Sequence, residues 1–180
     1  GRPQMPTAVD LAQTVKPMTP DTSLAWNLQV LNLAINPLTG AGRSLGTLLR
    51  SLSKLQMLNL MQCELALEDI EQIAKALPRS DLYFLDLAQN ELGSQGLMAL
   101  TRTMANSKLL TLGLERNEIG PGDALNELKL AHDKRPFILR LQKNHLTPEE
   151  LKAFEDSLKK INGDLCAPGC RCFEGRGEVM

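Results

Sequence analysis

The sequence has few aromatic residues, no long apolar run and no excess of charge of either sign. Aromatic residues make up 3% of the 180 residues, and 20 Lys and Arg nearly balance 21 Asp and Glu, for a formal net charge of −1. A balanced charge gives no long-range attraction for a polyanion, so nucleic acid is not an expected partner. A membrane helix needs about 20 mainly apolar residues in succession, which no segment approaches. The composition predicts a soluble, globular-sized protein.

The sequence also lacks the motifs of several enzyme classes and of secretion. It contains no glycine-rich phosphate loop, no H-E-x-x-H and no G-x-S-x-G. The first residues lack the basic start and apolar centre of a signal peptide, and no Asn-x-Ser/Thr acceptor occurs anywhere. These absences predict a non-catalytic protein of the cytoplasm, with the nucleus as an alternative.

What the sequence does contain is one pattern that recurs at a spacing of 27 residues. In the first copy, leucines at positions 28, 31, 33 and 38 surround Asn36. The later copies keep the spacing: Leu55, Leu58, Leu60, Cys63, Leu65; Leu82, Leu85, Leu87, Asn90, Leu92; Leu109, Leu112, Leu114, Asn117, Ile119; and Pro136, Leu139, Leu141, Asn144, Leu146. Self-similarity at a fixed period of this length indicates a solenoid.

Each repeat changes from a period of two to a period of three or four. Leu85 and Leu87 alternate with outward residues, as in a short strand, whereas Ile70, Ile73 and Leu77 form one helical stripe. Each repeat is therefore predicted to be one strand followed by one helix. Thr147, followed by Pro148 and two glutamates, predicts a capping box at the start of the last helix.

The asparagine position of the repeat is predicted to be structural. An amide can both donate to and accept from loop backbone groups that would otherwise be buried without partners as repeats stack. Cys63 is a small, partly polar substitute at the same place. The structural positions are Asn36, Cys63, Asn90, Asn117 and Asn144.

The pattern LxxLxLxx(N/C)xL followed by a helix resembles the leucine-rich repeat family, and the helix-bearing 27-residue version is similar to its ribonuclease-inhibitor-like subclass. The resemblance implies an α/β fold: a right-handed solenoid with a curved parallel sheet inside and helices outside. It implies no reaction. Similar repeats occur in innate-immune sensors, ubiquitin-ligase substrate receptors and bacterial effectors, so an alternative function is the targeting part of a larger protein.

The predicted organisation has three parts. Residues 1–27 form an N-terminal cap or degenerate repeat, in which Trp26 is a packing residue, because solenoid ends need covering. Residues 28–160 form five repeats (28–54, 55–81, 82–108, 109–135 and 136–160), and residues 161–180 form a C-terminal cap with a cysteine-containing tail. The fourth repeat departs from the pattern, since Ala124 and Glu127 replace bulky residues, and a shifted or distorted helix is expected there.

The outward residues of the strands form the predicted partner-binding face. An apolar cluster of this kind beside polar neighbours is typical of a protein-binding patch, although apolar side chains that pack across a sheet give the same pattern. The charged neighbours are either orienting groups or solvated surface residues. The candidates are Val30, Met57, Met61, Phe84, Asp86, Glu115, Arg116, Ile138, Arg140 and Lys143.

The two histidines and the cysteine tail provide weaker candidates. Cys166, Cys170 and Cys172 could bind zinc with a fourth ligand such as His145, but free thiols or a disulfide are favoured because the cluster has no matching half. No cofactor or metal is therefore expected. His132 is expected to be solvated in the last turn of a helix, where a positive charge is favourable. The predicted function is a non-catalytic module that recognises a partner protein on the concave sheet.

Overall fold

The computed structural model describes residues 27–159, in which strands and helices alternate along the chain. The strands are β1 (Val30–Asn32), β2 (Met57–Asn59), β3 (Phe84–Asp86), β4 (Thr111–Gly113) and β5 (Ile138–Arg140). The helices are α2 (Gly42–Ser51), α3 (Leu67–Ala76), the short 3₁₀ helix η2 (Leu77–Arg79), α4 (Gly93–Met104), α5 (Asp123–Lys134) and α6 (Pro148–Lys159). The predicted caps and tail, including Trp26 and the tail cysteines, lie outside the described residues.

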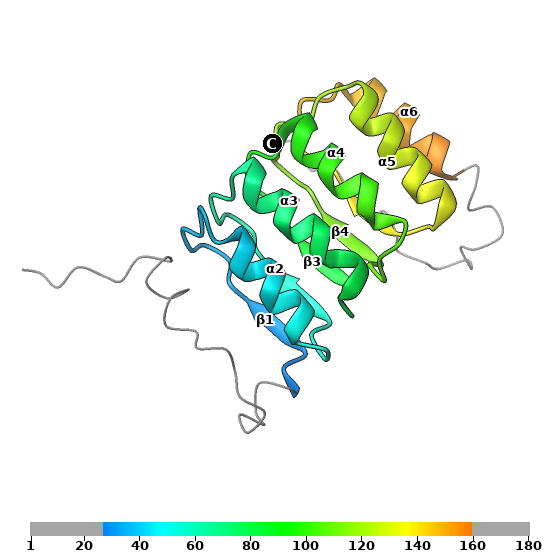
Figure 1. The fold of residues 1–180 in the computed structure, drawn as a ribbon. Coiled ribbons are helices and arrows are strands. Elements are labelled where there is room, and N and C mark those ends of the chain that lie inside the picture. Colours follow the sequence, from blue (N-terminus) through cyan, green and yellow to red (C-terminus); the bar gives the residue numbers. More distant parts are fainter. Residues whose placement is uncertain (1–26, 160–180) are drawn as a thin grey trace, which may run out of the picture.

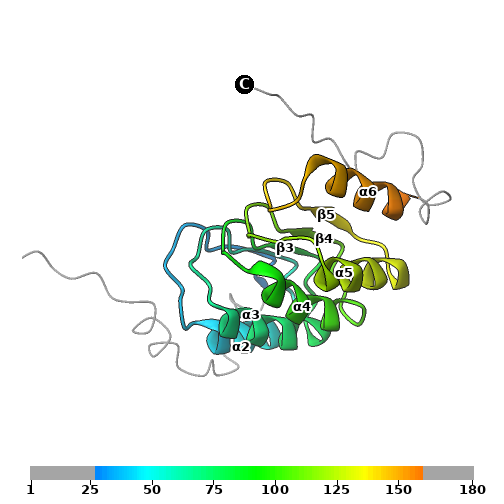
Figure 2. The same cartoon turned by 90° about the horizontal axis from the view of Figure 1, so that it is seen from above.

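The five strands form one parallel sheet in the order β1-β2-β3-β4-β5, and each residue pairs with the residue 27 positions later. Helices α2 to α5 lie side by side on one face of this sheet, and α6 follows β5 at the C-terminal end (Figures 1 and 2). The other face carries none of α2 to α5. This arrangement confirms the predicted α/β solenoid of strand-helix repeats, whose sheet is open rather than closed into a barrel.

The core lies between the sheet and the helices and is built from the repeated leucines. The central residue of β2, β3 and β4 is a fully buried leucine (Leu58, Leu85 and Leu112). The helices meet them with residues such as Ile73 and Leu100, which are also fully buried. Burial of each such side chain contributes about 1.5–3 kcal/mol, so this repeated layer stabilises strands that are only three residues long.

The ends of two helices follow local sequence features. Thr147 N–H donates to Glu150 Oε2 (2.8 Å) and Glu150 N–H donates to Thr147 Oγ1 (3.2 Å), which confirms the predicted capping box of α6. In the fourth repeat, the position equivalent to the first residue of α4 is Gly120, but α5 begins at Asp123. That start is equivalent to the start of α2 at Gly42, and what distinguishes the fourth repeat is its buried face: Leu125 and His132 are buried, whereas the equivalent Met98 and Ala105 of the third repeat are half-buried.

Candidate functional site

A row of outward side chains crosses the sheet face opposite helices α2 to α5. The strand register places one residue of each strand beside its equivalent in the next. The ends of the row are exposed, at 58% for Val30 and 40% for Ile138, whereas the middle is half-buried. The row consists of Val30, Met57, Phe84, Thr111 and Ile138. Met61, which is also half-buried, lies just after β2.

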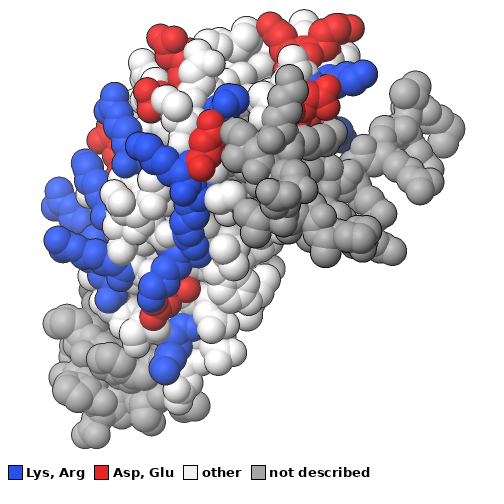
Figure 3. Space-filling model, turned by 90° about the vertical axis from the view of Figure 1, so that its right-hand side faces the viewer, with Lys and Arg blue, Asp and Glu red and all other residues white. Residues whose placement is uncertain are grey.

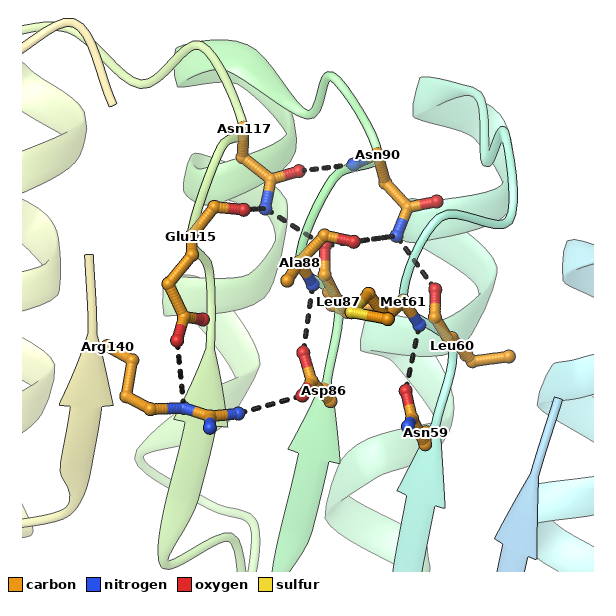
Figure 4. Close-up of polar contacts among 10 residues, drawn as sticks. All are labelled: Asn59, Leu60, Met61, Asp86, Leu87, Ala88, Asn90, Glu115, Asn117 and Arg140. Carbon is orange, nitrogen blue, oxygen red and sulfur yellow. Dashed lines mark hydrogen bonds and ion pairs between the residues drawn. The ribbon is translucent and has the colours of Figure 1, made fainter. Parts of the chain in front are cut away.

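Beside this row, Arg140 reaches across β4 and joins two carboxylates (Figure 4). Arg140 Nη2 donates to Asp86 Oδ2 (2.8 Å), and its Nε lies 3.2 Å from Glu115 Oε1. The residue between them on β4 is Gly113, where a Cβ atom would lie 2.6 Å from Asp86 Oδ1 and 2.7 Å from Arg140 Nη2. The missing side chain of Gly113 therefore leaves the space through which Arg140 contacts Asp86.

The electrostatics of this cluster are unbalanced toward negative charge. Burial raises the pKa of Glu115 above its ordinary value, and Asp86 raises it further, while a hydrogen bond from its own backbone N–H and the charge of Arg140 act in the opposite direction. Glu115 Oε2 is buried and has no hydrogen-bond partner among residues 27–159. The guanidinium of Arg140 also lies 5.8 Å from the centre of the Phe84 ring. Asp86, Glu115 and Arg140, which were candidate partner contacts, thus contact one another.

The asparagine position forms a ladder along the loops that follow the strands (Figure 4). Asn117 Oδ1 accepts hydrogen bonds from the N–H groups of Asn90 (3.0 Å) and Leu92 (3.3 Å), and its Nδ2 donates to the Leu87 carbonyl (2.9 Å). Asn90 makes the equivalent bonds one repeat earlier, and the Nδ2 and Oδ1 of Asn144 do so one repeat later. The ladder joins neighbouring repeats through buried polar groups.

Cys63 occupies the same position with a thiol. Its side chain is fully buried, and its Sγ donates to the Leu33 carbonyl at 3.1 Å. Burial raises the pKa of the Cys63 thiol, and the N–H groups of Asn36 and Ile35 oppose this shift. A buried thiol whose pKa is raised is a packing group rather than a reactive one. In the first repeat, Asn36 itself is exposed, and its side chain bonds only to the carbonyls of Leu33 and Ala34 among the described residues.

Arg116 and Lys143 lie together in a groove at the loop edge of the molecule. The groove has a volume of about 400 Å³, and its lining side chains make no hydrogen bond or ion pair with residues 27–159. Arg116 and Lys143 both have a positive φ, near 54° and 60°. The groove is lined by Gln62, Gln89, Glu91, Arg116, Glu118, Lys143 and His145.

His132 contradicts the prediction of a solvated histidine. It is 3% exposed, and its ring lies edge-on to that of Phe137, with centroids 5.0 Å apart. Burial lowers the pKa of His132 below its ordinary value. The altered buried face of α5 explains the error, because His132 follows the buried Leu125 and Leu128 at helical spacing and so faces the core.

Asp69 is a structural residue that the sequence analysis did not single out. It is 3% exposed, and its carboxylate accepts hydrogen bonds from the N–H groups of Gly42 (2.7 Å), Gly40 (3.0 Å) and Ala66 (3.0 Å). At Gly42, a Cβ atom would lie 2.3 Å from Asp69 Cα. The pair therefore joins the first two helical repeats through a close approach that only glycine permits.

The weaker metal candidates do not form a site in the described part of the chain. Cys166, Cys170 and Cys172 lie outside it, and His145 is an exposed residue of the loop-edge groove. Within residues 27–159, no group of three or more Cys, His, Asp or Glu side chains is placed to hold a metal ion. In the same range, no helix has the length and apolar character needed to cross a bilayer.

Comparison with known proteins supports the repeat interpretation. The family model described as a Leucine Rich repeat matches residues 82–100, which contain β3 and the first part of α4. No curated protein matches the chain. Leucine-rich repeat domains are typically non-catalytic and generally mediate interactions between proteins. The match and the parallel sheet together support placing the chain in a leucine-rich repeat family.

Proposed function

We propose that this protein is a non-catalytic recognition module of the cytoplasm that binds a partner protein on the sheet face opposite helices α2 to α5. The observation that carries the proposal is the row of Val30, Met57, Phe84, Thr111 and Ile138, which stand side by side in register on that face. Four of these five side chains are apolar although they point toward solvent. Apolar surface of this kind gains free energy when a partner covers it.

The charged residues divide the face into two regions. Asp86, Glu115 and Arg140 form a linked cluster beside Phe84, so they present a preorganised surface to a partner rather than three independent charges. Arg116 and Lys143 lie in the loop-edge groove and flank the row without an ion-pair partner in the described chain. An apolar centre with a polar rim is the usual anatomy of a protein interface. The repeat length of 27 residues, with a full helix in most repeats, favours the ribonuclease-inhibitor-like subclass within the family.

The competing interpretation is that the row stabilises the sheet by cross-strand packing. The two interpretations predict different costs for a charge in the row. Val30 and Ile138 are exposed, so a glutamate at either position remains solvated and costs little stability. Met57 and Phe84 are half-buried, so the same change there tests both roles at once.

The test is affinity capture from a native lysate with identification by mass spectrometry. The Met57→Glu/Phe84→Glu and Val30→Glu/Ile138→Glu variants are both expected to lose a protein that the unaltered chain captures. Leu130→Glu is the matched control, because Leu130 is an exposed apolar residue of α5 on the helical side and should leave capture unchanged. Thermal unfolding should shift by less than about 4 °C for Val30→Glu/Ile138→Glu, which corresponds to about 1 kcal/mol.

Two results would contradict the proposal. Capture that is unchanged in both row variants would move recognition away from this face. A large loss of stability in Val30→Glu/Ile138→Glu, with the captured proteins unchanged after correction for folded protein, would assign the row to packing alone.

A further inference from the structure

The edge of the solenoid at which the helices end carries exposed cations without carboxylate partners. Arg50, Arg102 and Lys134 lie in the last turns of α2, α4 and α5, Arg79 ends the short helix η2 that follows α3, and Lys54 lies in the link between α2 and β2. In Figure 3, which faces the right-hand side of Figure 1, Lys and Arg gather in a broad group on the helix side of the molecule. We call these five residues the basic edge.

The carboxylates near the basic edge are already occupied. Asp81 pairs with Lys108, and Asp133 pairs with Lys129 at 3.0 Å. Arg50 donates to the Thr47 hydroxyl, and the other four side chains of the basic edge make no hydrogen bond or ion pair within residues 27–159. The local positive charge is therefore not compensated by nearby side chains of the described chain, although the formal charge of the whole chain is −1.

Two exposed apolar residues stand beside the basic edge. Tyr83 and Leu110 are 36% and 49% exposed and immediately precede β3 and β4. They are neighbours, because Leu110 N–H donates to the Tyr83 carbonyl at 2.8 Å. The ion pair between Asp81 and Lys108 lies two residues before them on the same two links. Apolar surface and uncompensated positive charge thus meet at one edge, outside the row of the proposed function.

We propose that the basic edge, with Tyr83 and Leu110, is a second recognition surface that binds an acidic polypeptide segment containing apolar side chains. The charge pattern selects carboxylates, and Leu110 selects an aliphatic or aromatic anchor. A short segment bound at the edge interacts mainly with charges within a Debye length of about 8–10 Å, and these are mainly the cations of the basic edge. A long polyanion such as nucleic acid also meets the negative remainder of the molecule, and Tyr83 is the one ring of this surface on which a base could stack, so the nucleic-acid alternative is tested directly with a duplex.

The size of the edge sets the length of the segment. Neighbouring helices pack about 8–10 Å apart, so the edge from α2 to α5 extends for about 27 Å, which an extended segment of about eight residues covers at about 3.3 Å per residue. The probe is therefore a labelled peptide of about that length in which Glu alternates with Leu. Comparison peptides replace Leu by Ser or Glu by Lys, and a short DNA duplex tests the nucleic-acid alternative.

Fluorescence anisotropy of these probes gives the test. The Glu–Leu peptide should bind more tightly than the Glu–Ser peptide, and the Lys–Leu peptide should not bind. The affinity for the Glu–Leu peptide should decrease as the salt concentration is raised from about 0.02 M to about 0.3 M. Arg79→Glu/Arg102→Glu should lower the affinity for the Glu–Leu peptide by about tenfold, because two ion pairs with the peptide are lost and two repulsions are gained. Tyr83→Ser/Leu110→Ser should abolish the preference for Leu over Ser.

The matched control reverses the same amount of charge at the opposite edge. Arg43 and Lys152 are exposed cations near the beginnings of α2 and α6 and have no ion-pair partner in the described chain. Arg43→Glu/Lys152→Glu should leave peptide binding within about twofold of the unaltered protein, since exposed charges more than a Debye length away are screened. Met57→Glu/Phe84→Glu should also leave it unchanged, which separates this proposal from the proposed function.

Three results would overturn the proposal. The first is the absence of salt-dependent binding of the Glu–Leu peptide. The second is an equal loss in the Arg79→Glu/Arg102→Glu and Arg43→Glu/Lys152→Glu variants, which would mean non-specific attraction. The third is tighter binding of the DNA duplex, dependent on Arg79 and Arg102, which would make the edge a nucleic-acid surface instead.

Discussion

Replacement of Asn117 by alanine should destabilise the protein far more than the same change at Asn36, although both residues occupy the same position of the repeat. Asn117 is 0% exposed, whereas Asn36 is exposed. The Asn117 side chain serves two buried N–H groups, those of Asn90 and Leu92, and donates to the Leu87 carbonyl. Alanine removes all of these bonds, and water has no access to replace them.

The size of the effect follows from which groups lose their last partner. The Leu87 carbonyl keeps a hydrogen bond from Asn90 Nδ2, so it remains satisfied. The N–H groups of Asn90 and Leu92 have no other acceptor within residues 27–159 and become buried donors without partners. Each such donor costs about 1–3 kcal/mol, so Asn117→Ala should lower the free energy of unfolding by about 3 kcal/mol. Asn36→Ala should cost less than about 1 kcal/mol, because water replaces its bonds.

Urea unfolding followed by circular dichroism measures the two changes, and thermal unfolding should show a decrease of about 10 °C for Asn117→Ala. The pair of variants holds the chemical change and the repeat position constant, so only burial and the number of bonds differ. Equal losses in the two variants would refute the reasoning. So would a loss at Asn117 below about 1 kcal/mol, since an orphaned buried donor cannot cost so little.

Two further variants test the buried groups that the structure reveals. Gly42→Ala should lower the free energy of unfolding by about 1–3 kcal/mol in urea, because the new Cβ would lie 2.3 Å from Asp69 Cα and α2 must move away from α3. Gly120→Ala is the control: no atom lies within 4 Å of its Cβ position, so the free energy of unfolding should change by less than about 0.5 kcal/mol. His132 has a folded-state pKa below its ordinary value of 6.5, so the unfolded chain binds a proton first as pH falls. Stability should therefore decrease from pH 7 to lower pH, and His132→Leu should flatten this part of the stability profile; an unchanged slope would show that another group is responsible.

The fold could be predicted from the sequence because the solenoid repeats each local rule several times. A single leucine is weak evidence, but the recurrence of Leu58, Leu85 and Leu112 at one spacing fixes the strand register as well as the core. The capping box at Thr147 was predictable because both partners lie within one turn. The buried face of α5 was harder to predict, since the fourth repeat buries Leu125 and Leu128 in place of the pattern followed by α3 and α4.

The details of the face depended on contacts between distant repeats. Alternation of side chains in a strand identified the outward row, whose role remains a prediction. Alternation does not reveal that Arg140 bonds to Asp86, which lies 54 residues earlier, because that contact depends on the missing side chain of Gly113 between them. His132 was misjudged because its exposure follows from the phase of α5, although its spacing from Leu125 and Leu128 already indicated the buried side.

The segregation of charge has the same origin as the repeat itself. A cation near a helix C-terminus is stabilised by about 0.3–1 kcal/mol through the helix dipole. In an antiparallel bundle that preference places cations at both ends, but here the strands are parallel and successive helices run the same way, so Arg50, Arg79 and Arg102 accumulate at one edge. At the opposite edge the charges are mixed, because Glu91 and Glu118 line the same groove as Arg116 and Lys143. A rule that acts on each helix separately thus concentrates cations at one edge of a chain of nearly zero net charge, and partner selection by charge becomes possible where composition alone gave no reason to expect it.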